Sequence, residues 1–254
     1  MKSTQEPREG PTISEPDAPE AALRELCARV LGYERRQAIE HALRSIRLSV
    51  SHAAALFLLG DFEPDLVSVA RSLHRRTVGA DRPFVVCDRW LRQDSRAAVA
   101  AVQAARGGSL CVRRRRLPDD YPSAVALVRD PAAAVQLIIC AEARFDSHPF
   151  ATLPVPIVLP TLQKRASELP RIVDGYAADA VAALGAYEEC FANDDRAWVI
   201  DNARSLSQIE RATLRLVALR LARNPEEAAQ RLQMPGASLR QWLRRRAAQS
   251  AAHR

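Results

Sequence analysis

The chain has 254 residues, 48% of them hydrophobic and 26% charged, which is enough for one or two domains with a buried core. No apolar run reaches the roughly 20 residues of a membrane span, and no secretory signal is recognisable, so we expect a cytoplasmic protein without a membrane partner. The net charge of +7 suits an anionic partner.

The first 20 residues read as a disordered tail. Glu6, Glu9, Glu15, Asp17 and Glu20 stand there among prolines. Charged, proline-rich segments of this kind bury too little apolar surface to fold.

Strands and helices alternate over residues 21–165. A first helical segment begins at Pro19 and continues to about Leu48. Alternation of this kind indicates an α/β fold, a parallel sheet flanked by helices. The predicted strands are Ala54–Leu59, Phe84–Cys87, Ser109–Val112, Gln136–Cys140 and Val155–Val158.

The loop after the first strand resembles a nucleotide-binding loop that has lost its binding residues. A working P-loop reads G-x-x-x-x-G-K-[ST], with glycines and a lysine for the phosphates and a hydroxyl for Mg²⁺. Three carboxylates would repel a triphosphate, and a proline supplies no N–H donor. We therefore expect no ATPase activity, no nucleotide cofactor and no metal. The loop here reads Gly60, Asp61, Phe62, Glu63, Pro64, Asp65, Leu66 and Val67.

Five segments are similar to one family. They are Val69–His74, Arg82–Phe84, Ala105–Leu110, Val135–Ile139 and, most clearly, Val155–Pro170. They resemble the AAA+ domain of bacterial sigma-54-dependent activators, whose last motif reads V-P-I-x-L-P-P-L-R-E-R-x-x-D-I-P. The resemblance spans about residues 30–246. It implies an AAA+-like (P-loop NTPase-like) domain over 21–165 and a remnant helical lid over 166–192.

The departures from that family concern its catalytic parts. Arg113–Arg116 stand where the family has its metal-binding carboxylates, and the family's trans-acting arginine falls at Ala151. The sigma-54 contact loop has no room between Cys87 and Ala105. The resemblance therefore implies a pseudo-ATPase.

The basic run Arg113–Arg116 has three interpretations. It is a patch for an anion or nucleic acid, a solvent-exposed strand end, or part of a salt-bridge network with the acidic loop Asp61–Asp65. Such a network would replace nucleotide and Mg²⁺ in holding the fold together.

The five cysteines are widely spaced and form no C-x-x-C pair. We therefore expect reduced structural thiols rather than a redox or metal site. They are Cys27, Cys87, Cys111, Cys140 and Cys190.

The C-terminal part, residues 200–254, predicts a small all-α helix-turn-helix domain. A helix with a wide apolar face covers Leu206–Leu221, and Asn224-Pro225 separates it from the next helix. Two short helices joined by a tight turn follow, and the second is basic. This part resembles the Fis-type domain of the same activators, although Gln233 replaces the turn glycine. Asn193–Asp195 reads as the linker before it.

The second helix of this motif carries the candidate DNA-binding residues. A glutamine can reach an adenine edge, whereas arginine contacts to phosphates position a protein without reading sequence. The alternative is a helical bundle whose arginines form a solvated face. The candidates are Ser238, Arg240, Gln241, Arg244, Arg245 and Arg246.

Two hypotheses of function follow. The first is a transcriptional regulator that binds double-stranded DNA without ATP hydrolysis, located on the nucleoid, and dimeric through the helix Leu206–Leu221. Its two half-sites would lie about one helical turn apart. The second is a protein-interaction module whose AAA+-like body binds a partner, such as active members of the family. A ring-forming ATPase with an unusual loop is the least favoured reading.

Overall fold

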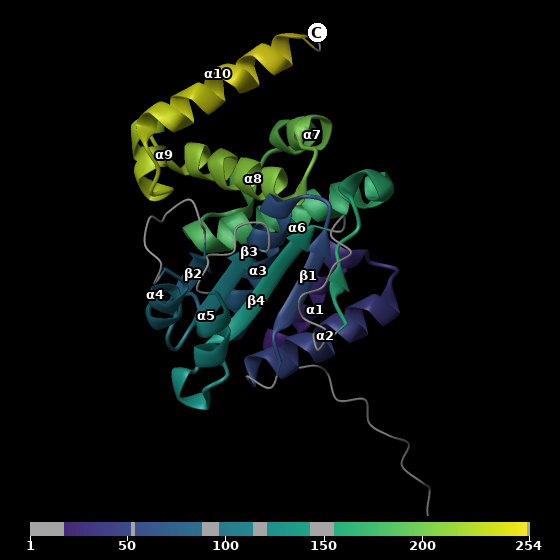
Figure 1. Cartoon of the computed structure of the whole chain (residues 1–254). Helices are drawn as coiled ribbons and strands as arrows, with labels where there is room; N and C mark the ends of the chain where they lie inside the picture. The colour runs from purple at the N-terminus through teal and green to yellow at the C-terminus, as the bar shows by residue number, and fades with distance from the viewer. Residues whose placement is uncertain (1–17, 52–53, 88–96, 114–120, 143–154, 253–254) are drawn as a thin grey trace, which may run out of the picture.

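The protein was analysed as a computed structural model, which describes residues 18–51, 54–87, 97–113, 121–142 and 155–252. Its centre is a five-stranded parallel sheet in the order β2-β3-β4-β1-β5 (Figure 1). This confirms the predicted α/β class. The strands are β1 (Leu56–Gly60), β2 (Phe84–Cys87), β3 (Ser109–Arg113), β4 (Gln136–Glu142) and β5 (Ile157–Val158).

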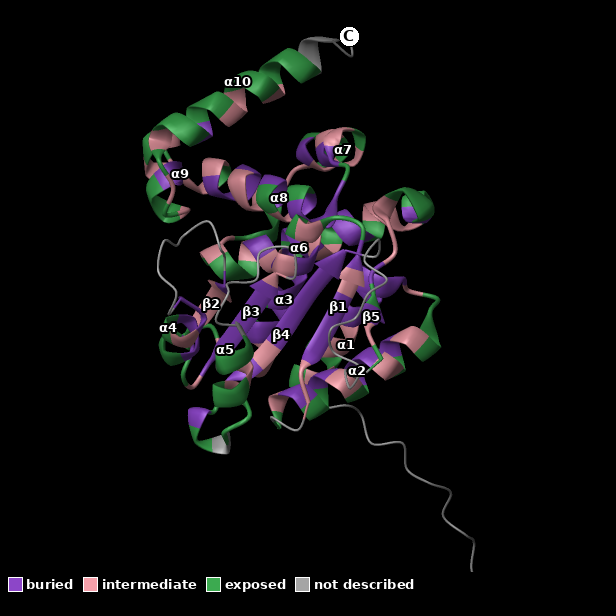
Figure 2. Cartoon of the chain, viewed as in Figure 1, coloured by how far each residue is buried: buried purple, intermediate pink, exposed green. Residues whose placement is uncertain are grey.

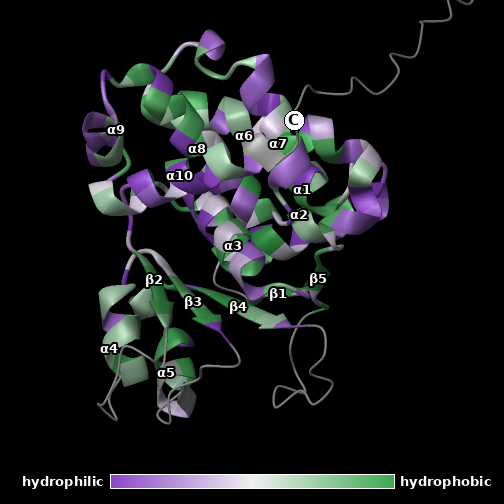
Figure 3. Cartoon of the chain, turned by 90° about the horizontal axis from the view of Figure 1, so that it is seen from above, coloured by the Kyte–Doolittle hydropathy of each residue, from purple (hydrophilic) through white to green (hydrophobic). Residues whose placement is uncertain are grey.

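Helices cover both faces of this sheet. Seen from above, α1 (Ala18–Leu31), α2 (Arg36–Val50) and α3 (Glu63–Thr77) lie on one side (Figure 3). On the other side lie α4 (Ala97–Ala104) and α5 (Tyr121–Val128). Because α1 begins at Ala18, the last three residues of the predicted tail are helical, and the rest of that tail lies outside the described residues.

Strand β1 shows why its residues form a central strand. Leu56 and Leu58 are buried with the helices α1, α2 and α3, whereas Phe57 is buried on the opposite face. Successive side chains of a strand point to opposite faces, so a strand buried on both reads as a continuous apolar run. Strand β1 pairs with β4 on one side and β5 on the other. Strand β1 is thus an internal strand, and its carboxyl end lies at the sheet edge where open α/β sheets bind ligands.

Gly108, before β3, allows a close approach of two segments. A Cβ at this position would lie 2.1 Å from the carbonyl oxygen of Pro83. The next residue, Ser109, donates its backbone N–H to that same oxygen at 2.9 Å. Only glycine fits, and the contact sets the register in which β2 and β3 begin.

The rest of the described chain is helical. A short helix, η3 (Pro131–Ala133), precedes β4, and η4 (Leu162–Glu168) and η5 (Glu188–Cys190) flank α6. The α-helices of this part are α6 (Leu169–Leu184), α7 (Asn193–Asn202), α8 (Leu206–Leu221), α9 (Pro225–Arg231) and α10 (Gly236–Ala252).

The predicted linker Asn193–Asp195 is wrong, because these residues form the first turn of α7. Asp194 and Asp195 lie where the positive end of the helix dipole favours acidic side chains. Asp195 is also only 2% exposed, which a linker residue would not be.

Helix α8 belongs to the main core. Leu206, Ile209 and Leu216 are buried in the same cluster as the residues of α1, α2 and α3, and α8 packs on α6 (Figure 2). The apolar face that we expected to join two copies is therefore covered by the chain's own helices.

No helix among the described residues is long and apolar enough to cross a bilayer. All five cysteines are free thiols, and all but Cys190 are buried. Within the described part of the chain, no three His, Cys, Asp or Glu side chains are grouped as a metal site would require.

Candidate functional site

The loop at the carboxyl end of β1 is shorter than its resemblance to a nucleotide loop suggests. Strand β1 ends at Gly60, and α3 already begins at Glu63 with Phe62 as its N-cap residue. Pro64 favours this early start, because a proline in the first turn costs no helical hydrogen bond. Only two residues remain between strand and helix. They leave no row of backbone N–H groups to surround a phosphate.

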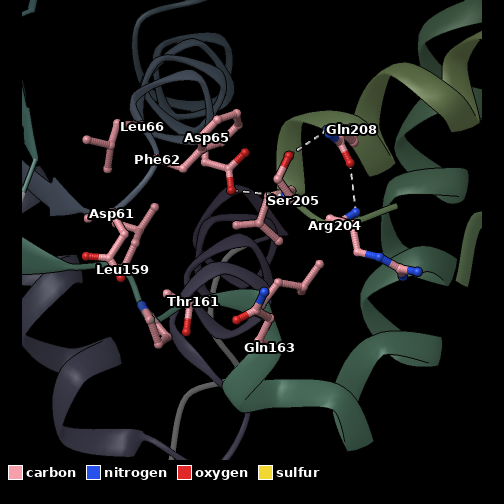
Figure 4. Close-up of a pocket in the computed structure, with 14 residues that line it drawn as sticks. Asp61, Phe62, Asp65, Leu66, Leu159, Thr161, Gln163, Arg204, Ser205 and Gln208 are labelled. Atoms are coloured by element: carbon pink, nitrogen blue, oxygen red, sulfur yellow. Dashed lines mark hydrogen bonds between the residues drawn. The ribbon is translucent and has the colours of Figure 1, made fainter. Parts of the chain in front are cut away.

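Asp65 occupies the N-terminus of α8 with its carboxylate. One oxygen accepts the backbone N–H of Ser207 at 2.8 Å. The other accepts that of Leu206 at 3.1 Å (Figure 4). The N-terminus of a helix carries partial positive charge and free N–H groups, and it readily binds an anion. Here the anion is part of the chain. Asp65 thereby joins α3 to α8.

Glu63 pairs with Arg113 at the end of β3. The Nε of Arg113 lies 3.0 Å from Oε1 of Glu63, and their side chains are 17% and 14% exposed. Arg113 is therefore not a solvent-exposed strand end, and this pair supports the interpretation as an internal salt bridge. Arg114–Arg116 and Ala151 lie outside the described residues.

A cavity of about 260 Å³ adjoins this loop (Figure 4). Asp61 and Asp65 line it from the β1 side, and Arg204 and Gln208 line it from the start of α8. With two carboxylates among its lining residues and one arginine, the cavity repels phosphate more than it attracts it. No lysine is among its lining residues.

Arg165, in the segment of closest resemblance, is used inside the fold. Its guanidinium donates to the carbonyl oxygens of Arg29 at 2.7 Å and Val30 at 3.0 Å, and to Glu168 at 2.9 Å. It is only 5% exposed. Because these contacts fasten η4 to the end of α1, Arg165 is a structural residue here.

The second candidate site consists of α9, the turn at residues 232–235 and α10. Leu239 of α10 is fully buried against Ala228 and Ala229 of α9. Asn224 caps α9 by accepting the N–H of Glu227 at 2.9 Å. Sequence and structure thus agree on two helices joined by a tight turn.

Most of the predicted DNA-binding residues share the exposed surface of α10. Ser238, Arg240, Gln241, Arg244 and Arg245 are exposed. Arg240 pairs with Glu226 of α9 at 2.5 Å, and both side chains are about half exposed. Exposed pairs of this kind contribute about 0–1 kcal/mol, so Arg240 is easily released to another anion. Arg244 and Arg245 have no carboxylate partner within the described part of the chain.

Arg246 is held differently from its neighbours. It donates to the buried Asp195 at 2.6 Å and lies over the ring of Trp198, 5.3 Å from its centroid. Arg220 of α8 pairs with the other oxygen of Asp195 at 2.9 Å. Asp195 therefore connects α7, α8 and α10, and Arg246 fixes the position of α10. The role of Asp195 is not visible in the sequence, because Asp195 stands in a run of polar residues typical of a linker.

Gln233 in the turn adopts the left-handed conformation, with φ of +51°. This conformation costs a side-chain-bearing residue about 1 kcal/mol, whereas glycine adopts it freely. We expect Gln233→Gly to raise the free energy of unfolding by about 1 kcal/mol, measured by urea denaturation. Gln230→Gly, at an exposed position in the last turn of α9, is the control and should lower the free energy of unfolding or leave it unchanged. Equal effects of the two changes would contradict the assignment of strain to Gln233.

No protein-family model matches this sequence. No curated protein matches it either. Among solved structures, the chain is similar to NtrX from Brucella abortus in complex with ADP, with a TM-score of 0.46 and 14% identity over 83% of this chain and 68% of that one. For NtrX from the same organism in complex with ATP, the TM-score is 0.44 and the identity 16%, over 82% of this chain and 67% of that one. For a third structure of NtrX from this organism, the TM-score is 0.45 and the identity 17%, over 80% of this chain and 55% of that one. The chain therefore spans about half the length of the chain in that third structure.

Proposed function

We propose that the protein is a transcriptional regulator that binds double-stranded DNA through α10 and hydrolyses no ATP. The observation that carries the proposal is the exposed surface of α10, where Ser238, Gln241, Arg244 and Arg245 are all accessible. Helix α10 also lies at the edge of the molecule, on the far side of α8 from the sheet (Figure 1).

The composition of this surface suits two roles, the reading of bases and the binding of phosphates. Gln241 lies in the N-terminal half of α10, where recognition helices contact base edges, and a glutamine bonds adenine through two atoms. Arg244 and Arg245 follow within the next turn and suit phosphate oxygens. With 17 residues, α10 is about 25 Å long, enough to lie along a major groove.

The proposal that ATP is not hydrolysed rests on the loop after β1. Asp65 stands where a nucleotide loop has a glycine, and Leu66 stands where it has the lysine. The carboxylate of Asp65 accepts hydrogen bonds from the start of α8, and that of Glu63 forms an ion pair with Arg113. These groups stabilise the loop region without a ligand.

Retention of genomic fragments tests the proposal. Purified protein is incubated with sheared genomic DNA at near-physiological salt, captured, and the bound DNA is sequenced. An enriched motif supports a sequence-specific regulator, and a palindromic motif would also support a dimer. Uniform retention would indicate backbone binding alone. Absence of retention would contradict DNA binding and leave the protein-interaction hypothesis, with the α/β body as the binding part.

A further inference from the structure

A second cavity, of about 270 Å³, lies between α7, α8 and α10. We call it the arginine–tryptophan pocket. Its walls include two tryptophans packed edge to face, with ring centroids 5.6 Å apart. The residues that define it are Trp198, Trp242, Arg211, Arg215, Arg245 and Arg246.

The pocket has more positive charge than the described chain balances. Only Arg246 has a carboxylate partner among the described residues, Asp195. Arg211 donates to the backbone carbonyl of Ser207 at 2.9 Å, and Arg215 lies over the ring of Trp242. Three guanidinium groups thus surround one cavity with no acid facing them.

The arrangement is electrostatically unfavourable for the charge of Arg215. Burial lowers the pKa of its guanidinium, and the charges of Arg211 and Arg245 lower it further. Like charges brought together around a half-buried position repel one another, and a bound anion would relieve this repulsion. The described fold offers no internal anion here, in contrast to Asp65 at the start of α8.

We propose that the arginine–tryptophan pocket binds phosphate groups. Guanidinium groups bond phosphate oxygens in pairs, and they stay charged at every physiological pH. The phosphate comes either from a free phosphorylated molecule or from the DNA backbone, since Arg245 lies on α10 near the exposed surface. The first source does not depend on DNA binding.

Inorganic pyrophosphate tests the first source. Two of the chain's three tryptophans line the pocket, so intrinsic fluorescence reports binding. We expect a saturable fluorescence change for the full chain, and at least tenfold weaker binding for Arg215→Gln. Arg106→Gln removes an exposed arginine away from the pocket and is the matched control. Because Arg215→Gln removes a repelled charge, its melting temperature should not fall. If the melting temperature of the Arg215→Gln variant does fall, Arg211→Gln, at an exposed position, provides a second variant.

A random-sequence DNA duplex tests the second source. If a backbone phosphate enters the pocket, Arg215→Gln should reduce the slope of log affinity against log salt by about 0.9. Weaker pyrophosphate binding or a reduced salt slope for duplex DNA in the pocket variants supports the proposal and identifies the source of the phosphate. The proposal is overturned if both pocket variants bind both probes as the unmodified chain does, or if pyrophosphate does not bind and the salt slope is unchanged. Because pyrophosphate binding needs no DNA, a failure there is distinguishable from a failure of the proposed function.

Discussion

Replacing both Arg244 and Arg245 by glutamine is expected to lower the affinity for random duplex DNA at least tenfold at near-physiological salt. Both side chains are exposed on α10, and neither is committed to a carboxylate of the described chain. Each arginine that neutralises a phosphate releases condensed counterions, so two lost contacts reduce the salt slope by about 1.8. Fluorescence anisotropy of a labelled duplex, titrated at several salt concentrations, measures both quantities.

The matched control is Arg44→Gln with Arg106→Gln, which removes the same charge from exposed positions far along the sequence. It should change the affinity only slightly. Gln241→Ala provides a separate test of base reading, because it should weaken discrimination between sequences by about 1–3 kcal/mol while leaving the salt slope unchanged. If the double arginine variant binds as the unmodified chain does, α10 is not the surface that contacts DNA.

Glu63→Ala is expected to lower the free energy of unfolding by about 3 kcal/mol. The change removes the carboxylate whose Oε1 lies 3.0 Å from Nε of the mostly buried Arg113 at the end of β3. Removing one partner of a buried ion pair is costly because the remaining charge stays poorly solvated. Urea denaturation measures this loss, with the same dependence of the unfolding free energy on urea concentration (the m-value) used for all variants.

Asp61→Ala is the control for Glu63→Ala, since Asp61 is an exposed acid of the same loop. It should change stability by less than about 0.5 kcal/mol. The same preparations test nucleotide binding, because a ligand at 100 times its Kd would stabilise the chain by about 2.7 kcal/mol. We expect no rise in melting temperature with Mg²⁺ and ATP. A rise in melting temperature that corresponds to about 2.7 kcal/mol of stabilisation would refute the pseudo-ATPase proposal.

The sheet was predictable because its signal is local. Each strand is a short apolar run such as Leu56–Gly60 or Gln136–Glu142, and a run of this kind needs no partner to be recognised. Helix α7 was not predictable in the same way. Its first turn is polar, and it is stabilised by Arg220 and Arg246, which lie 25 and 51 residues beyond Asp195.

For the candidate site, too, the residue types were predictable from the sequence, whereas the long-range contacts were not. Sequence alone indicates that the loop lacks the groups that bind a nucleotide, because that conclusion needs only the residue types. It does not indicate what the acids do instead. Asp65 accepts the backbone N–H of Ser207, which is 142 residues away, and Glu63 of α3 forms an ion pair with Arg113 at the end of β3. Contacts at such separation leave no pattern in a single sequence.

The burial of α8 in the main core has a practical consequence for anyone who shortens this chain. A fragment that starts at residue 200 would carry Ile209 and Leu216 without the helices that cover them. Such a fragment would expose an apolar stripe to water and tend to aggregate. Shortened variants meant for DNA-binding assays should therefore retain α6 and α3, and a graft onto another scaffold should supply a substitute surface for α8.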